Sequence, residues 1–204
     1  TESMKHMTPY MLVIFISLLL SCDNNDTEPN TPNITPDGYT LVWSDEFDGP
    51  GIDPGKWAFE TGDGTAYGLP AGWGNNEKQI YTDSEDNAHI AMVDGESSLV
   101  ITANEDGAGG YTSAKLTTNG LHSIRFGRID VRAKMPEGQG LWPAIWMLGE
   151  NKDLIDWPGC GEIDLAEVLG HETSRLNSTL HFANGENSHE QITNIHDLSS
   201  GSFN

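Results

Sequence analysis

Three carboxylates lie within six residues of the chain, at Glu162, Asp164 and Glu167. In an extended strand alternate side chains share a face, so Glu162 and Asp164 point the same way, whereas unbroken alternation sends Glu167 to the opposite face. A bulge at Leu165 and Ala166 would return Glu167 to the shared face, because one extra residue in a strand re-aims the side chains that follow it. With such a bulge, the spacing predicts three acids lining one cleft.

Like charges this close cannot all stay ionised cheaply, so at least one of the three carboxyl groups is expected to have a raised pKa and to hold its proton near neutrality. A proton donor beside an anion suits glycoside hydrolysis, in which retaining enzymes place the two reacting carboxyl groups roughly 5 to 5.5 Å apart. On this reasoning Glu162 is the nucleophile and Glu167 the acid/base. Asp164 would hydrogen-bond the nucleophile or share its proton.

Two plainer interpretations of the acids are a solvated acidic strand face and a divalent-metal site. The flanking segments are apolar and bounded by glycine, which favours a strand inside a fold. Trp142, Trp146 and Trp157 lie just upstream, and sugar rings stack on aromatic faces of this kind. Trp142 and Trp146 could equally belong to the core, since large aromatic residues usually bury. The flanking residues therefore favour a carbohydrate cleft, whereas Trp142 and Trp146 could line that cleft or belong to the core.

The segment W-P-G-C-G-E-I-D-L-A-E-V-L-G at residues 157–170 resembles the active-site strand of glycoside hydrolase family 16, in its laminarinase-type branch. Three further segments agree in order. V-W-S-D-E-F-D-G at 42–49 resembles the family's opening strand, G-W-G-N-N-E at 72–77 its substrate-side loop, and G-L-W-P-A-I-W-M-L at 140–148 the strand before the catalytic one. The resemblance runs from about Tyr39 to the end of the chain.

The resemblance implies an all-β sandwich, a concanavalin A-like jelly-roll with a concave cleft, and a retaining mechanism with the roles given above. Laminarinase-type members have the extra residue of the six-residue motif and lichenase-like members lack it, which favours β-1,3-glucan over strictly mixed-linkage β-1,3-1,4-glucan. Agarases and carrageenases share the longer motif, and some relatives are non-catalytic glucan-binding proteins. Those alternatives stay open.

The resemblance also implies substrate-binding residues outside the acidic motif. His181 lies in S-T-L-H-F at 178–182, where strand alternation turns it toward the cleft, although a satisfied surface histidine is the plainer interpretation. The resemblance places Asn75 at an outer subsite together with an arginine, for which we select Arg128, and Glu77 is a further polar group suited to sugar hydroxyls. Many members hold a calcium ion near the opening strand, where Glu46 would contribute. A structural calcium ion is therefore an expectation, and no cofactor is required.

The formal net charge is −21, with only ten Lys plus Arg residues. Such a charge argues against nucleic acid and anionic lipid surfaces as partners, because both would be repelled. A neutral glucan fits, whereas a sulfated galactan would need a local basic patch. The expected partner is thus a β-glucan polysaccharide, bound by a monomer.

Residues 1–22 have the features of a signal peptide. The ten apolar residues 11–20 are too short for a membrane span of about 20 residues, and they follow Lys5 and His6. L-L-S-C at 19–22 resembles a lipobox, in which Cys22 is lipidated after cleavage, and a plain secretory signal is the alternative. The polar residues 23–38 would then form a disordered tether. The expected location is the bacterial cell envelope or cell surface, otherwise the medium.

Residues 39–204 form the predicted hydrolase domain. Short alternating runs separated by Gly, Asn and Asp recur there without a long 3.6-residue period, which is an all-β pattern. We expect strands at residues 98–103 and 177–183, and a longer strand at 121–135 that bends at Gly127, where the alternation changes phase. The sequence stops within what resembles an interstrand loop. The domain is therefore expected to be partial, incomplete at its C-terminus and poorly stable by itself.

Overall fold

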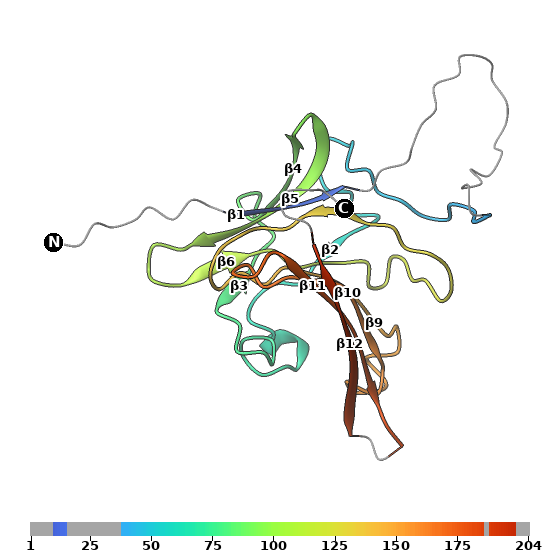
Figure 1. Ribbon diagram of the computed structural model, residues 1–204. Helices are drawn as coiled ribbons and strands as arrows, with labels where there is room; N and C mark the ends of the chain where they lie inside the picture. Colours follow the sequence, from blue (N-terminus) through green and yellow to red (C-terminus); the bar gives the residue numbers. More distant parts are fainter. Residues whose placement is uncertain (1–9, 16–37, 186–187, 199–204) are drawn as a thin grey trace.

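The computed structural model describes residues 10–15, 38–185 and 188–198 (Figure 1). These residues form strands joined by turns, and the helical element among them is the 3-10 turn η1 (Thr65–Tyr67). The all-β class predicted from the alternating runs is confirmed. The strands are β1 (Tyr10–Phe15), β2 (Ala58–Phe59), β3 (Gln79–Tyr81), β4 (Ala88–Val93), β5 (Glu96–Glu105), β6 (Tyr111–Ser113), β7 (Leu116–Thr117), β8 (Arg132–Lys134), β9 (Ala144–Leu148), β10 (Glu162–Glu167), β11 (Arg175–Ala183) and β12 (His189–Asp197).

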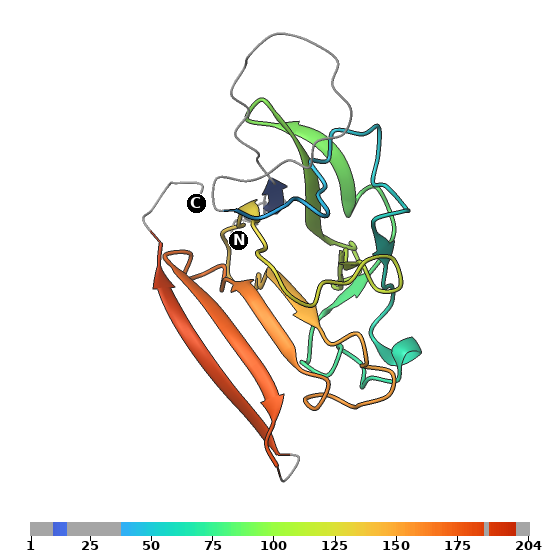
Figure 2. The ribbon, with the colours of Figure 1, turned by 90° about the vertical axis from the view of Figure 1, so that its right-hand side faces the viewer.

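Two main sheets organise the described residues. One has the order β3-β6-β5-β1-β8, with β4 also pairing with β5, and the other has the order β12-β11-β10-β9. A two-stranded ladder joins β2 and β7. Figure 2 shows the second sheet in orange and red, with β11 and β12 as a long hairpin, and the green strands of the first sheet on the other side. In the second sheet β10 is an inner strand, held by ladders on both sides.

The best-buried apolar residues lie along β4 and β5 and on the segments that pack against them. Leu99 of β5 is 1% exposed and packs in a cluster with Phe47, Ala88 and Ala114, against which Trp57 also packs. Burial of such side chains stabilises by about 1.5–3 kcal/mol each. This cluster fixes the opening segment around Phe47 against the first sheet.

The four-stranded sheet has one apolar face and one polar face. Across the strands, Ile163 pairs with Met147 and with Leu180, and Leu180 pairs with Ile192. Because neighbouring residues in a strand alternate between faces, this apolar row leaves Asp164 and its flanking partners to the other face. The alternation of side chains along each strand therefore places Asp164 and its cross-strand neighbours on the same face of the sheet.

The strand predicted at 121–135 is wrong in its extent, because of those residues only Arg132–Lys134 are in a strand. A strand persists only where a partner completes its ladder, and β8 pairs with Val13 to Phe15 of β1 over these three residues. Gly127 has a φ of 145°, so the bend predicted there is present without a strand around it. The strands predicted at 98–103 and 177–183 are confirmed as parts of β5 and β11.

Part of the predicted signal peptide is a strand in this structure, since β1 (Tyr10–Phe15) pairs with β5 and with β8. Cys22 and almost all of the predicted tether lie outside the described residues. The signal peptide, lipidation and tether therefore stay predictions. No helix in the described ranges is long and apolar enough to cross a membrane.

Candidate active site

The bulge predicted in the acidic strand is confirmed. Asp164 pairs with Thr179 of β11 and Glu167 pairs with Asn177, so β10 advances by three residues while β11 advances by two. The side-chain oxygen of Ser178 donates a hydrogen bond of 2.9 Å to the carbonyl oxygen of Leu165, inside the bulge. The extra residue thus has a specific partner, and Glu167 is re-aimed after it.

Glu162, Asp164 and Glu167 all line one groove, together with His181 of β11. The Asp164 side chain is only 5% exposed, and its Oδ2 atom lies 3.1 Å from His181 Nε2. That Oδ2 atom has no partner of good hydrogen-bond geometry, so the short distance to His181 is its main polar contact. His181 Nε2 also lies 3.9 Å from Glu162 Oε1. The expected turn of His181 toward the acids is confirmed.

Two tryptophans hold the two outer acids. Trp157 Nε1 donates to Glu162 Oε2 at 3.0 Å, and Trp142 Nε1 donates to Glu167 Oε1 at 3.1 Å. Both rings are about half exposed, at 48% and 50%, and both line the groove. Trp142 is therefore not a core residue. The contact of Trp157 was not predicted, although the closeness of this tryptophan to Glu162 in the sequence was a signal for it.

The pKa of each acid is raised, and burial is the largest cause in each case. Burial and the charge of Glu162 raise the pKa of Asp164 to about 6. Burial raises the pKa of Glu162, opposed by His181, Trp157 and a hydrogen bond from Asp164. Burial and the charge of Asp164 raise the pKa of Glu167. The expectation of at least one carboxyl with a raised pKa is confirmed.

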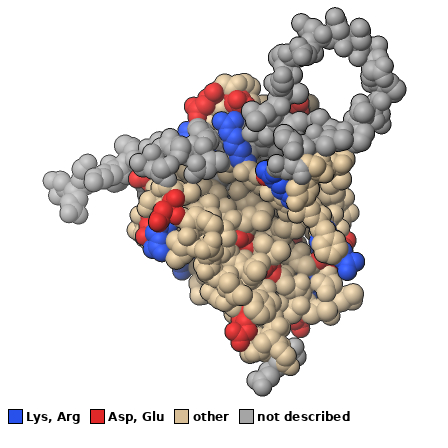
Figure 3. Space-filling view, turned by 45° about the vertical axis from the view of Figure 1, so that its right-hand side comes forward, with Lys and Arg blue, Asp and Glu red and all other residues tan. Residues whose placement is uncertain are grey.

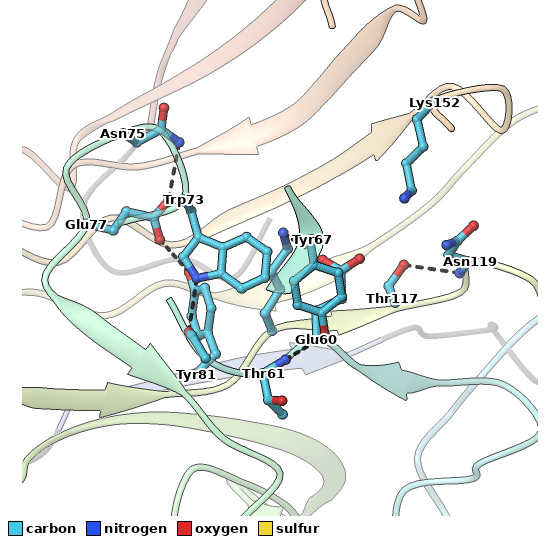
Figure 4. Close-up of polar contacts among 12 residues, drawn as sticks. Glu60, Thr61, Tyr67, Trp73, Asn75, Glu77, Tyr81, Thr117, Asn119 and Lys152 are labelled. Atoms are coloured by element: carbon cyan, nitrogen blue, oxygen red, sulfur yellow. Dashed lines mark hydrogen bonds and ion pairs between the residues drawn. The ribbon is translucent and has the colours of Figure 1, made fainter. Parts of the chain in front are cut away.

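Asn75 and Glu77 form a second polar cluster, shown in Figure 4. Asn75 Nδ2 donates to Glu77 Oε1 at 3.2 Å, and the Tyr81 hydroxyl donates to Glu77 Oε2 at 2.9 Å. Gln79 also donates to Oε2. Burial, followed by the charge of Glu77, raises the pKa of Tyr81, which keeps that hydroxyl a donor. Asn75 and Glu77 line the groove of the acids, and their role in binding substrate stays a prediction.

Lys115 was missed by the sequence reasoning. Its Nζ atom lies 3.9 Å from the ring centroid of Trp73 and 5.1 Å from that of Trp146, and it forms a 2.7 Å ion pair with Glu60. Trp146 is 38% exposed, lines the groove and pairs with Asp164 in the β9–β10 ladder. Because Lys115 and its three partners are far apart in the sequence, no local pattern predicts their contact.

Arg128 lies in the segment between β7 and β8, where its Nε atom pairs with Asp130 Oδ1 at 2.9 Å. Both side chains are largely exposed, and Arg128 lies along the groove lining. Nothing in this geometry distinguishes it as the subsite arginine, so that role stays a prediction.

Within the described residues, one group of three side chains has metal-ligand spacing. Its members are Glu162, Asp164 and His181, whose nearest donor atoms all lie within 4.8 Å of one another. Hydrogen bonding and charge pairing among these groups explain that spacing without an ion. Glu46, expected near a calcium ion, has a pKa raised by burial and by Asp45 and Asp48.

The residues around Glu46 do not fit a calcium site by themselves. Asp45 accepts hydrogen bonds from Lys56 Nζ and from Trp57 Nε1, so its oxygens are already engaged. Calcium takes six to eight oxygen ligands, and the group of side chains with metal-ligand spacing found among the described residues does not include Glu46. The calcium expectation stays a prediction.

The chain matches the family model described as Glycosyl hydrolases family 16 over residues 75–204. A beta-glucanase from Rhodothermus marinus is 37% identical over 187 residues, which are 88% of this chain and 59% of that protein. The solved laminarinase catalytic domain of Thermotoga maritima MSB8 is 41% identical, with a TM-score of 0.62 over 80% of this chain and 64% of that one. LamA from Z. galactanivorans, solved with laminaritriose and laminaritetraose, is 31% identical, with a TM-score of 0.66 over 80% and 71%.

The chain thus spans less than two thirds of the first two of these proteins, at 59% and 64% of their lengths. The structural likenesses confirm the predicted β-sandwich of the jelly-roll type.

Proposed function

The chain belongs to glycosyl hydrolase family 16, and from that premise we propose that it is an endo-acting, retaining hydrolase of β-1,3-glucan or mixed-linkage β-1,3-1,4-glucan. The observation that carries the proposal is the bulged strand β10, which brings Glu162, Asp164 and Glu167 into one groove. Two carboxyl groups of different protonation across a glycosidic bond are what double displacement needs.

Glu162 is the nucleophile in this proposal. Three neighbours favour its charged form, namely the Trp157 N–H, the His181 ring and a hydrogen bond from Asp164. The same hydrogen bond raises the pKa of Asp164, so the proton of this pair belongs on Asp164. Asp164 thereby keeps Glu162 ionised and ready to attack the anomeric carbon.

Glu167 is the acid/base. Burial keeps its proton in place, while Trp142 orients one of its oxygens. In the first step the Glu162 carboxylate bonds to the anomeric carbon while Glu167 gives its proton to the departing glycosidic oxygen. In the second step Glu167 takes a proton from water, the water oxygen attacks that carbon, and Glu162 is released as a carboxylate.

The groove supports a polymeric, neutral substrate. It is part of a larger cavity of about 3580 Å³, whose lining also includes residues of the first sheet such as Leu99. Trp142, Trp146 and Trp157 offer exposed aromatic surface along it for sugar rings. The described part of the face in Figure 3 is mostly uncharged, with acidic and basic side chains scattered over it. The net charge of −21 suits a neutral glucan better than a sulfated galactan.

Export is part of the proposal and rests on the sequence features of residues 1–22. Cys22 would carry the lipid, which would tether a monomeric domain at the cell envelope. A Cys22→Ser variant expressed with labelled fatty acid should lose the label that the native chain acquires. A native chain released unlabelled into the medium would show a plain secretory signal instead.

The test of the proposed activity is reducing-end release from laminarin, lichenan, agarose and carrageenan by the complete protein. Laminarin or lichenan should be cleaved to oligosaccharides of several lengths. Glu162→Gln and Glu167→Gln should each lower kcat by at least about 1,000-fold, because each step loses its reacting group. Glu172, whose side chain is 42% exposed and pairs with Arg175, provides the control Glu172→Gln, and that variant should match the native enzyme.

Three results would contradict the proposal. Laminarin binding without any product over long incubation would indicate a glucan-binding protein. Cleavage of agarose or carrageenan alone would assign another substrate. Full activity in either glutamine variant would remove the assigned roles.

A further inference from the structure

Both ring nitrogens of His181 have partners. Nε2 faces Asp164 Oδ2 at 3.1 Å, and Nδ1 lies 2.8 Å from Nε2 of His189 on β12. The two imidazole rings are stacked, with centroids 5.0 Å apart and planes 29° apart. The β11–β12 ladder brings them together, because it pairs Ala183 with His189 and His181 with Gln191. His189 thus stands behind His181, on the side away from the acids.

Trp157 joins this histidine pair to the nucleophile. Its ring centroid lies 4.5 Å from that of His189 and 5.9 Å from that of His181, while its Nε1 donates to Glu162. His189 therefore contacts Trp157, which donates a hydrogen bond to Glu162, and His181, which faces Asp164. Its own ring is on the exposed side of this cluster.

A distance of 2.8 Å between two ring nitrogens requires one proton between them. If His181 Nδ1 carries that proton, a neutral His181 has a bare Nε2 and can accept from a protonated Asp164. If His189 carries it, His181 Nε2 carries a hydrogen that faces Asp164 Oδ2, which leaves the proton of Asp164 on its other oxygen, free to be donated to Glu162. His189 therefore determines whether the His181 Nε2 atom that faces Asp164 carries a hydrogen.

Resting on the proposed function, we propose that His189 is a positioning residue of the active site, which fixes the ring and the proton of His181 and through it the hydrogen bond from Asp164 to Glu162. His189 does not contact the reacting atoms. The titratable groups that face His181 are Glu162, Asp164 and Glu167 on β10 and His189 on β12. Among these, His189 is the group that approaches its Nδ1 side.

Two substitutions separate hydrogen bonding from packing. His189→Phe keeps a flat ring against Trp157 but has no ring nitrogen, whereas His189→Gln places an amide near the position of Nε2 without an ionisable group. In the complete protein His189→Phe should lower kcat on laminarin about tenfold, leave KM within about twofold and move the acid limb of the kcat profile. His189→Gln should recover most of the loss in kcat. His196→Phe, farther along β12, should behave as the native enzyme.

A loss in His189→Gln at least as large as that in His189→Phe would mean that a hydrogen-bonding group at this position does not restore activity, and native kinetics and pH profile in His189→Phe would mean that the ring only packs. Either result overturns the proposal. Nitrogen-15 shifts of the His181 ring, recorded without substrate, report which nitrogen carries the proton. They should change in His189→Phe, and unchanged shifts also overturn the proposal. Failure of the proposed function would instead leave the native protein inactive on every polysaccharide, while these shifts still test the pair.

Discussion

Asp164 is the residue at which burial and charge conflict most strongly. Its side chain is 5% exposed and lies between a second carboxyl group and a histidine. Keeping the proton on Asp164 resolves the conflict, because the neutral carboxyl can be buried and can donate to Glu162. In the proposed mechanism Asp164 thus donates a hydrogen bond to the nucleophile and is not a third reacting acid.

Asp164→Asn tests this state through stability. The pKa of Asp164 rises from 3.8 to about 6 on folding, so between these values the folded state binds more protons than the unfolded state, and the free energy of unfolding falls as pH rises. Asparagine cannot ionise. The variant should therefore gain stability relative to the native protein between about pH 4 and about pH 7, by up to about 3 kcal/mol at 1.36 kcal/mol per pKa unit.

Denaturant unfolding at those two pH values measures the difference, with Glu172→Gln as a control that should show none. If the native protein and Asp164→Asn keep a constant separation across this range, Asp164 does not hold a proton. The variant should also lose activity, since Glu162 loses the carboxyl group beside it.

The sequence could predict the acids but not all of their partners. The spacing of Glu162, Asp164 and Glu167 is covalent, so it carries over directly to a strand. The contacts of Lys115 and His189 depend on how distant strands pair and pack, and no local pattern encodes that. His181 is an intermediate case. Alternation along β11 predicts the face on which it lies, whereas its contact with His189 depends on the register of the β11–β12 ladder.

At the scale of the element, the bulge in β10 determines which side Glu167 faces. Ser178 secures it from the neighbouring strand by donating to the Leu165 carbonyl oxygen at 2.9 Å. A buried carbonyl without such a donor costs about 1–3 kcal/mol. The bulge is therefore stabilised by a side chain that takes no part in the chemistry.

Ser178→Ala removes this donor and should loosen the bulge. We expect a loss of about 1 kcal/mol in the free energy of unfolding, together with a several-fold lower kcat as Glu167 loses its fixed direction. Thermal unfolding and laminarin kinetics measure the two effects. Ser178→Thr keeps the hydroxyl and serves as the control. An alanine variant with native kcat would show that the bulge holds without Ser178.

The mistaken strand at residues 121–135 shows what alternation alone leaves out. Ile129, Val131 and Ala133 alternate as a strand should, but only the last of these lies in one. Alternation reports which side chains can be buried, while a strand also needs a ladder partner along its length. By contrast β10 and β11, which have partners on both sides, formed where the pattern predicted.

At the scale of the whole molecule, the large negative net charge and the aromatic groove both bear on the charge of the substrate. A net charge of −21 repels polyanions at low ionic strength, while binding to a neutral polymer depends on aromatic stacking and hydrogen bonds. The tryptophans near the acids supply the stacking surface. These features support the proposal that the substrate is an uncharged polymer.

Salt dependence should separate neutral from anionic substrates. The KM for laminarin should change by less than about twofold between about 0.05 and 0.5 M sodium chloride, since no charge on the substrate is screened. Any cleavage of carrageenan should be weakest at the lower concentration. A laminarin KM that varies strongly with salt, or a preference for carrageenan at low salt, would contradict this account of the groove.

The stereochemistry of hydrolysis tests the central claim most directly. Proton NMR during the first minutes of laminarin cleavage by the complete protein distinguishes β from α at newly formed reducing ends. Double displacement through Glu162 and Glu167 predicts that the β anomer forms first and mutarotates to the mixture afterwards. Initial formation of the α anomer would mean that water attacks directly, and the assignment of Glu162 as nucleophile would fail.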